Sequence, residues 1–252
     1  MDYNCRVFDY PTGQHVTFYK KAIQTGEMKN ENCKKSYRRE ERERTEQEEK
    51  HCLSVSLKNT KNKIYQIARS NNMWEWFITL TFDRTKTDAS DYEEVVKKIT
   101  NFLDKTRERK CPNMKYLIVP ELHADGKHYH FHGLLSDCDG LHFAYSGRND
   151  RKSGKPIFNI KDWALGFTTA TRVEDVERVS SYIAKYITKD TMKHLKNKKR
   201  YYSSHNMNIV EPDFFVMDEE DFQRLYADRI TYCKTVDIPE AHQRVTYYEL
   251  RD

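Results

Sequence analysis

The middle of the chain, residues 74–190, alternates between segments with the two-residue period of strands and segments with the longer period of amphipathic helices. The segments 74–83 (WEWFITLTFD) and 115–122 (KYLIVPEL) are rich in aromatic and β-branched residues, which predicts two strands. Between them, 91–110 carries an apolar stripe at helical spacing and begins with Asp91, a favourable N-cap residue. A helix is therefore expected between the two strands.

The next segments continue this pattern. The turn ADGK leads into a third strand that ends near residue 135, and a loop rich in Asp, Gly and Ser follows over 137–156. A fourth strand is expected at 166–173 (GFTTATRV) and a second helix at 174–190. The order β-α-β-β-β-α predicts an α+β fold, in which an antiparallel central sheet is flanked by helices packed mainly on one side.

The two flanks of this region have weaker patterns. Residues 34–50 are almost entirely charged, with both signs interspersed, which is typical of an exposed helix or a linker. A short helix is expected at 62–71, and beyond residue 205 another short helix is followed by two strand-like segments. We expect an N-terminal extension over 1–50, a central domain over 51–205 and a C-terminal extension over 206–252.

The third strand contains three histidines at every second position, namely His128, His130 and His132. Residues at i, i+2 and i+4 of a strand point to one face, so the three imidazoles project together. Tyr129, Phe131 and Gly133 then face the core on the other side. Isolated histidines are usually surface residues of a solvent-facing sheet, but three in this arrangement favour a metal site.

A carboxylate is available to complete such a site. The strand before the ADGK turn ends in Glu121, and the turn folds it back beside the histidines. His123, on the same strand, is a weaker candidate, and His128 remains an alternative third ligand. Imidazole and carboxylate ligands with open positions suit Mg²⁺ or Mn²⁺, and an open site lets the ion act as a Lewis acid on a phosphodiester oxygen.

The helix expected at 174–190 carries two tyrosines, Tyr182 and Tyr186, one turn apart at the edge of its apolar stripe. Each is followed three residues later by a lysine, Lys185 and Lys189. A phenol becomes a useful nucleophile when nearby positive charge favours the phenolate or a base takes its proton, and lysines also stabilise charge developing on a phosphate. The alternative is a helix with tyrosines at the core margin and lysines in solvent.

Charge and composition narrow the possible partners. The net charge is +5, and 33% of residues are charged. A basic stretch follows the tyrosines and predicts contact with a polyanion such as nucleic acid. Abundant tyrosine also permits base stacking, for which Trp74, Trp76, Trp163 and Tyr201 or Tyr202 are candidates. The basic residues predicted to bind DNA are Lys193, Lys196, Lys198, Lys199 and Arg200.

Other classes are excluded by missing patterns. The sequence has no apolar stretch long enough for a membrane span and no secretory signal pattern, so a cytoplasmic location is expected. No pair among the six cysteines has the C-x-x-C spacing of a zinc knuckle. The helical H-E-x-x-H motif, the phosphate loop of ATPases and the G-x-S-x-G elbow are likewise missing.

Taken together, three motifs resemble those of the HUH endonuclease superfamily, specifically rolling-circle replication initiators of the two-tyrosine type. They are WFITLTF at 76–82, HFHGLL at 130–135 and YIAKYITK at 182–189. The resemblance covers about 74–190 and implies a ferredoxin-like, RRM-like core. It also implies cutting of single-stranded or hairpin origin DNA in a bacterial host cell, with a 5′-phosphotyrosine link and a free 3′-hydroxyl.

The resemblance also assigns roles to residues. His130 and His132 would be metal ligands with Glu121 as the third, Tyr182 and Tyr186 nucleophiles, and Lys185 and Lys189 helpers at the phosphate. The chain shows no helicase motif, so a host helicase and polymerase are expected partners. A transposase or relaxase of the same superfamily and a non-catalytic nucleic-acid-binding regulator remain the alternative functions.

Overall fold

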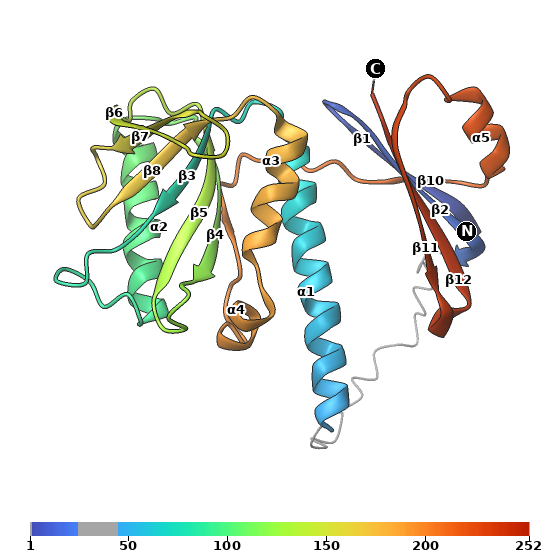
Figure 1. Ribbon diagram of the computed structural model, residues 1–252, viewed down its shortest axis with the longest axis horizontal. Coiled ribbons are helices and arrows are strands. Elements are labelled where there is room, and N and C mark those ends of the chain that lie inside the picture. Colours follow the sequence, from blue (N-terminus) through green and yellow to red (C-terminus); the bar gives the residue numbers. More distant parts are fainter. Residues whose placement is uncertain (1, 25–44, 252) are drawn as a thin grey trace. The chain divides into compact units, whose positions relative to one another are not determined.

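The computed structural model describes residues 2–24 and 45–251, which form two compact units. One unit spans 46–209, and the other combines the described parts of 1–45 and 210–252. No helix among the described residues is long and apolar enough to cross a membrane. Figure 1 labels the helices and strands of both units.

The unit 46–209 is built on a seven-stranded sheet in which every paired strand is antiparallel. The strand order is β6-β7-β8-β3-β5-β4-β9. This confirms the predicted α+β class with an antiparallel sheet. The strands are β3 (Trp76–Leu80), β4 (Lys115–Leu122), β5 (Tyr129–Ser136), β6 (Phe143–Asn149), β7 (Pro156–Ile160), β8 (Thr168–Arg172) and β9 (Tyr202–Ser203).

The helix α2 (Tyr92–Arg109) connects β3 to β4, and β4 and β5 form a hairpin. Asp91 caps α2, accepting hydrogen bonds from the backbone N–H groups of Glu93 and Glu94. Between β5 and β8 the chain adds the paired strands β6 and β7 instead of a helix. The predicted loop over 137–156 is therefore wrong in part, since it contains most of β6.

Helices cover both faces of this sheet, which corrects the expectation that they pack mainly on one side. Val95, Ile99 and Leu103 of α2 pack on one face with Ile78 and Phe131 of the strands. The helix α1 (Glu46–Arg69) packs on the other face together with α3 (Val176–Ile183) and α4 (Lys189–His194). α1 extends far beyond the helix predicted at 62–71, and Arg69 at its end pairs with Glu177 of α3 (Nη1–Oε2 3.3 Å).

The predicted helix at 174–190 is interrupted. α3 ends at Ile183, a short 3₁₀ turn η1 (Ala184–Tyr186) follows, and Ile187 is extended. Thr188 then caps α4, its hydroxyl accepting a hydrogen bond from the N–H of Thr191. Because Ile187 is completely buried in the cluster between the sheet and α1, packing rather than helical continuity determines its position.

The other unit contains a five-stranded antiparallel sheet with the order β10-β1-β2-β12-β11. α5 (Glu219–Leu225) packs on it, with Phe222 against Phe18 and Tyr248. Strands from both ends of the chain therefore share one sheet. They are β1 (Asp2–Tyr10), β2 (Gly13–Gln24), β10 (Asp213–Phe215), β11 (Ile230–Ile238) and β12 (Gln243–Leu250), and η2 (Pro239–Ala241) joins the last two.

Candidate metal and tyrosine site

Glu121, His130 and His132 come together on one face of the sheet. In the β4–β5 hairpin Glu121 lies directly opposite His130, and His132 follows two residues later on the same face. Oε2 of Glu121 accepts hydrogen bonds from Nε2 of His130 (2.7 Å) and from Nε2 of His132 (2.8 Å). The alternation of the strand and the short hairpin are sufficient to explain this convergence.

The three side chains fit a metal ion. Each offers one ligand atom, and these atoms all lie within 4.8 Å of one another. Burial alone would raise the pKa of Glu121, but the hydrogen bonds from both histidines outweigh burial and lower the pKa to about 2. Burial lowers the pKa of His132. At neutral pH both groups are therefore in the forms that bind a cation, an ionised carboxylate and a neutral imidazole.

A hydroxyl that the sequence reasoning missed orients one ligand. Thr79 of β3 lies directly opposite His132 in the sheet, and its Oγ1 is 3.1 Å from Nδ1 of His132. The hydroxyl can accept or donate, so it suits either tautomer of the ring. His130 differs, because its Nδ1 is buried without a hydrogen-bond partner among the described residues.

His128, the first histidine of the predicted row, belongs to a different cluster. Its Nδ1 lies 2.6 Å from Oδ2 of Asp125, and the guanidinium of Arg84 lies 3.1 Å from the same oxygen. His123 is also near this carboxylate at 3.6 Å, and its ring meets that of His130 edge-on. The geometry therefore favours Glu121 over His128 as the third ligand.

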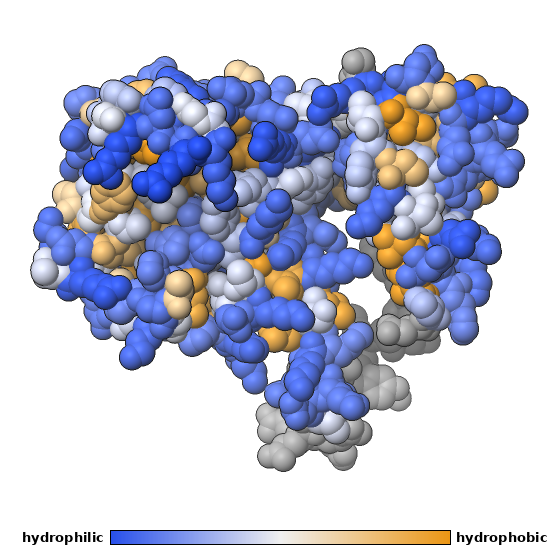
Figure 2. Space-filling view, viewed as in Figure 1, coloured by the Kyte–Doolittle hydropathy of each residue, from blue (hydrophilic) through white to orange (hydrophobic). Residues whose placement is uncertain are grey.

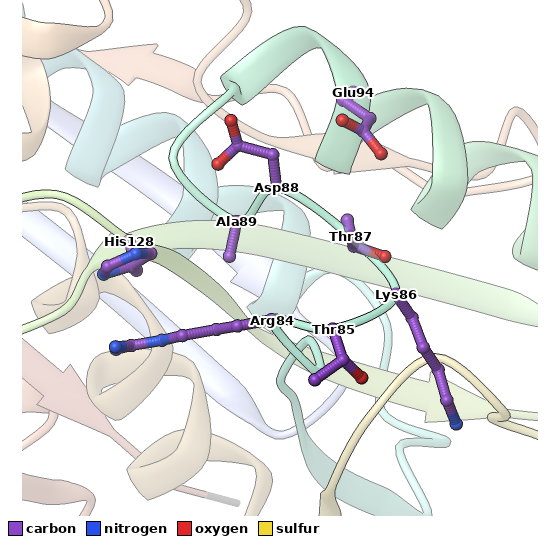
Figure 3. A pocket seen from close by; sticks show the side chains of 8 residues that line it. All are labelled: Arg84, Thr85, Lys86, Thr87, Asp88, Ala89, Glu94 and His128. Atoms are coloured by element: carbon purple, nitrogen blue, oxygen red, sulfur yellow. The ribbon is translucent and has the colours of Figure 1, made fainter.

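A pocket of about 400 Å³ lies at this second cluster (Figure 3). It is formed by the loop after β3 and by His128, and in Figure 3 the side chain of Arg84 extends toward that histidine. None of the three candidate ligands lines it. Its walls carry both charges and are Arg84, Thr85, Lys86, Thr87, Asp88, Ala89, Glu94 and His128.

The structure brings the tyrosines to the candidate ligands. The ring of Tyr186 stacks on His132, with 3.5 Å between the ring centroids. Phe77 of β3 lies within 6 Å of His132, Tyr182 and Tyr186, so the four rings form one aromatic cluster. Sequence reasoning placed the tyrosines above the histidines only through the family resemblance, and it did not identify Phe77.

The two tyrosines have different surroundings. Tyr182 is 46% exposed, whereas Tyr186 is half-buried. Burial, a hydrogen bond with Tyr182 and the charge of Glu121 together raise the pKa of Tyr186 well above its ordinary value. Without a cation nearby, Tyr186 therefore keeps its proton. A positive charge at the Glu121 cluster would oppose the two electrostatic causes.

The two lysines do not form the continuous row that a single helix would give. Lys185 lies in η1 and its ammonium is 5.9 Å from the centre of the Tyr182 ring. Lys189 begins α4 after the break, is exposed, and makes no hydrogen bond or ion pair within the described ranges. Only Lys185 is therefore placed beside a tyrosine.

Most of the predicted DNA-binding cations already have protein partners. Lys193 pairs with Asp190 (3.3 Å) and Lys198 with Glu93 (3.6 Å). Lys196 lies 3.9 Å from Glu49, and the ammonium of Lys199 lies over the ring of Tyr202. Arg200 is half-buried and donates to the hydroxyls of Ser56 (2.6 Å) and Thr60 (3.2 Å) in α1.

The tryptophans suggested as base-stacking surfaces are core residues. Trp74, Trp76 and Trp163 are each 4% exposed, and Tyr202 is 8% exposed. Trp76 stacks on Phe143, and Trp163 packs edge-on against Phe82. These rings stabilise the unit and are not available to stack on bases.

Comparison with known proteins agrees with the position of this site. No curated protein and no solved structure matches the chain. Residues 75–191 match the family model of the replication-associated protein ORF2. The match covers somewhat less than half of the chain, and it contains β3, the three candidate ligands and both tyrosines. The segment that forms the site is thus similar to replication-associated proteins.

Proposed function

We propose that the protein initiates rolling-circle replication by nicking and joining single-stranded origin DNA through a 5′-phosphotyrosine intermediate. The observation that carries this proposal is the stacking of Tyr186 on His132, because it puts a nucleophile next to a candidate metal ligand. The match of 75–191 to replication-associated proteins supports the same conclusion. The active location would be the cytoplasm of a bacterial host.

Glu121, His130 and His132 would hold the divalent ion, for which we propose Mg²⁺ or Mn²⁺. When bound, the ion would supply Lewis acidity to an oxygen of the scissile phosphate. Thr79 keeps the ring of His132 oriented through its Nδ1. The stacked ring of Tyr186 covers one side of His132 and so limits the directions from which the DNA can approach.

Tyr186 would make the first attack. Its Oη bonds to phosphorus while the bond from phosphorus to the 3′ oxygen breaks. The phenol proton passes to water, and the leaving oxygen takes up a proton to become the 3′-hydroxyl primer. Lys185, exposed beside Tyr182, would stabilise the negative charge on the phosphate, and Lys189 would contact the same strand further along.

Tyr182 would perform the second transfer. Its ring centre is 5.3 Å from that of Tyr186, so both hydroxyls can reach one phosphate position in turn. While Tyr186 stays bonded to the 5′ end, the exposed Tyr182 remains available to attack a newly made junction. A host helicase and polymerase would supply unwinding and synthesis, because the sequence contains no phosphate loop of the ATPase type.

The experiment incubates the purified protein with labelled single-stranded origin DNA and Mn²⁺, followed by a denaturing gel. A covalent protein–DNA band is expected, and it should disappear with EDTA and in the Tyr182→Phe/Tyr186→Phe variant. Binding of authentic origin DNA without any metal-dependent adduct would refute the enzyme and leave a non-catalytic regulator. Cleavage restricted to the ends of a mobile element or to a transfer origin would instead identify a transposase or a relaxase.

A further inference from the structure

We infer that the single-stranded DNA runs from the metal and tyrosine site across the part of the sheet formed by β8 and β7 to the β6–β7 hairpin. The inference rests on the proposed function and adds the path of its substrate. It replaces the basic stretch 193–200 as the principal DNA contact, because that stretch is mostly paired with protein groups.

The face of the sheet that carries the histidines continues onto β8. Thr79 contacts His132, so its side chain lies on this face. Thr169 lies opposite Thr79 and Thr171 opposite Phe77, and directly opposite residues of antiparallel strands point to the same face. β8 therefore presents two threonines beside the site.

The same face extends to β7 and β6. Phe158 packs against Trp76 in the opposite core, so its neighbours Ile157 and Asn159 point to the histidine face. Arg148 of β6 lies opposite Ile157, after a register shift that begins at Tyr145. Such a bulge changes the direction of the side chains that follow it, and here it turns Arg148 toward the histidine side.

This part of the face has no helical cover. The cluster under α1, α3 and α4 draws its strand residues from β4, β5 and the start of β3, and none from β7 or β8. In Figure 1 α2 lies behind the sheet and no helix crosses in front of β8 and β7. Hydrophilic side chains predominate over these strands in Figure 2, with a few apolar ones between them.

The exposed groups suit a nucleic-acid strand. Thr169 and Thr171 are half-exposed, and their hydroxyls have no hydrogen-bond partner within 45–251. Hydroxyl and amide groups commonly contact phosphate and sugar oxygens, and Asn159 adds an amide to this surface. The surface is thus a polar floor rather than an apolar docking face.

The hairpin supplies the positive charge. Between residues 148 and 155 four cations, Arg148, Arg151, Lys152 and Lys155, face one acid, Asp150. Arg148 and Arg151 are exposed and have no ion pair in the part of the chain that the structure describes. Neighbouring strands lie about 4.8 Å apart, so β6 is roughly 19 Å from β5. The path is long enough for several contacts with an extended strand.

The test measures binding of the full-length protein to a fluorescein-labelled single-stranded oligonucleotide of mixed sequence, about 20 nucleotides long so that it exceeds typical site sizes. EDTA is present, so no metal-dependent cleavage interferes. The Arg148→Ala/Arg151→Ala variant is compared with Lys193→Ala/Lys196→Ala, which removes the same charge. A Thr169→Val/Thr171→Val variant removes only the hydroxyls, and thermal unfolding verifies that each variant is folded.

The hairpin variant should bind at least about 10-fold more weakly, and its dependence of log affinity on log salt should fall by roughly 1 to 1.5. The lysine variant should change affinity by less than about twofold, and the threonine variant should weaken binding with an unchanged salt slope. Equal weakening by both charge variants, wild-type binding by the hairpin variant or no binding by the wild type would overturn the inference.

The covalent-adduct assay separates this inference from the proposed chemistry. Hairpin-dependent binding without an adduct on authentic origin DNA would leave the strand path standing and remove the nicking reaction. An adduct formed by the wild type, together with a hairpin variant that binds and reacts normally, would keep the reaction and overturn the path.

Discussion

The ring of Tyr186 lies nearly parallel to the imidazole of His132, with 3.5 Å between the centroids and 21° between the planes. Since His132 belongs to the group that can hold an ion, this contact puts one tyrosine closer to the candidate metal centre than its partner. Tyr182 contacts the same cluster through Phe77 and remains 46% exposed. We therefore expect the two tyrosines to be unequal in function.

Replacing Tyr186 with Phe should slow formation of the first covalent DNA adduct at least about 10³-fold, because the nucleophile is lost while the stacked ring remains. Tyr182→Phe should form this first adduct at nearly the wild-type rate and fail in the second transfer. Single-turnover kinetics with a labelled oligonucleotide measure both steps. A normal first adduct in Tyr186→Phe would refute the assignment.

Glu121→Gln should reduce the affinity for Mn²⁺ at least about 100-fold, because a neutral amide replaces the only carboxylate among the three ligands. Calorimetric titration of the full chain measures this. Asp125→Asn is the matched control, since Asp125 holds His128 rather than the histidine pair. If the control lost the ion and Glu121→Gln kept it, His128 would have to be reconsidered as a ligand.

Thr79→Val should weaken Mn²⁺ binding by about 10- to 100-fold, the usual effect of losing a group that orients a ligand. The side chain keeps its shape and loses the hydroxyl bonded to His132. Thr169→Val is the control, because Thr169 lies opposite Thr79 without contacting a ligand. Equal metal affinity in both variants would show that Thr79 has only a structural role.

Gly133→Ala should lower the free energy of unfolding by about 1–3 kcal/mol. A Cβ at this position would lie 2.3 Å from Cδ1 of Ile118, which is completely buried and has little room to move. Ile118→Val removes that methyl group, so the double variant should lose less stability than the two separate changes predict. Urea unfolding measures all three variants, and strict additivity would contradict the proposed contact.

Burial raises the pKa of Cys138 to about 12 from 9.0, which makes stability depend on pH. Below pH 9 the thiol is protonated in both states. As the pH rises from 9 toward 12, the unfolded chain ionises first, so the folded state loses up to about 1.4 kcal/mol per pH unit. Urea unfolding of the wild type at pH 8 and pH 10 should show a larger loss than Cys138→Ala, and identical losses would contradict this.

The candidate ligands could be predicted from the sequence because they depend on local geometry. The two-residue period of a strand puts His130 and His132 on one face, and a short hairpin brings Glu121 opposite His130. The capped helix after Asp91 is equally local. Thr79 was missed because its approach to His132 depends on which strand lies beside β5, and the sequence pattern does not contain that information.

The other differences also result from contacts between distant segments. Ile187 continues the apolar stripe of α3, so the sequence favours an unbroken helix, yet its burial beside α1 ends the helix before it. The lysines near 193–198 look free in the sequence, but Glu49 and Glu93 approach them from other elements. Free and paired cations can be distinguished only after the chain has folded.

The unit that carries the site lies, in sequence, between β2 and β10 of the other unit's sheet. β2 pairs with β12, and the amide of Gln243 bonds to the backbone of Lys21 across more than two hundred residues. During synthesis β1 and β2 must therefore wait for the last strands, while 46–209 can fold first. Removing either end alone would leave the remaining strands with an open edge, and such edges promote aggregation.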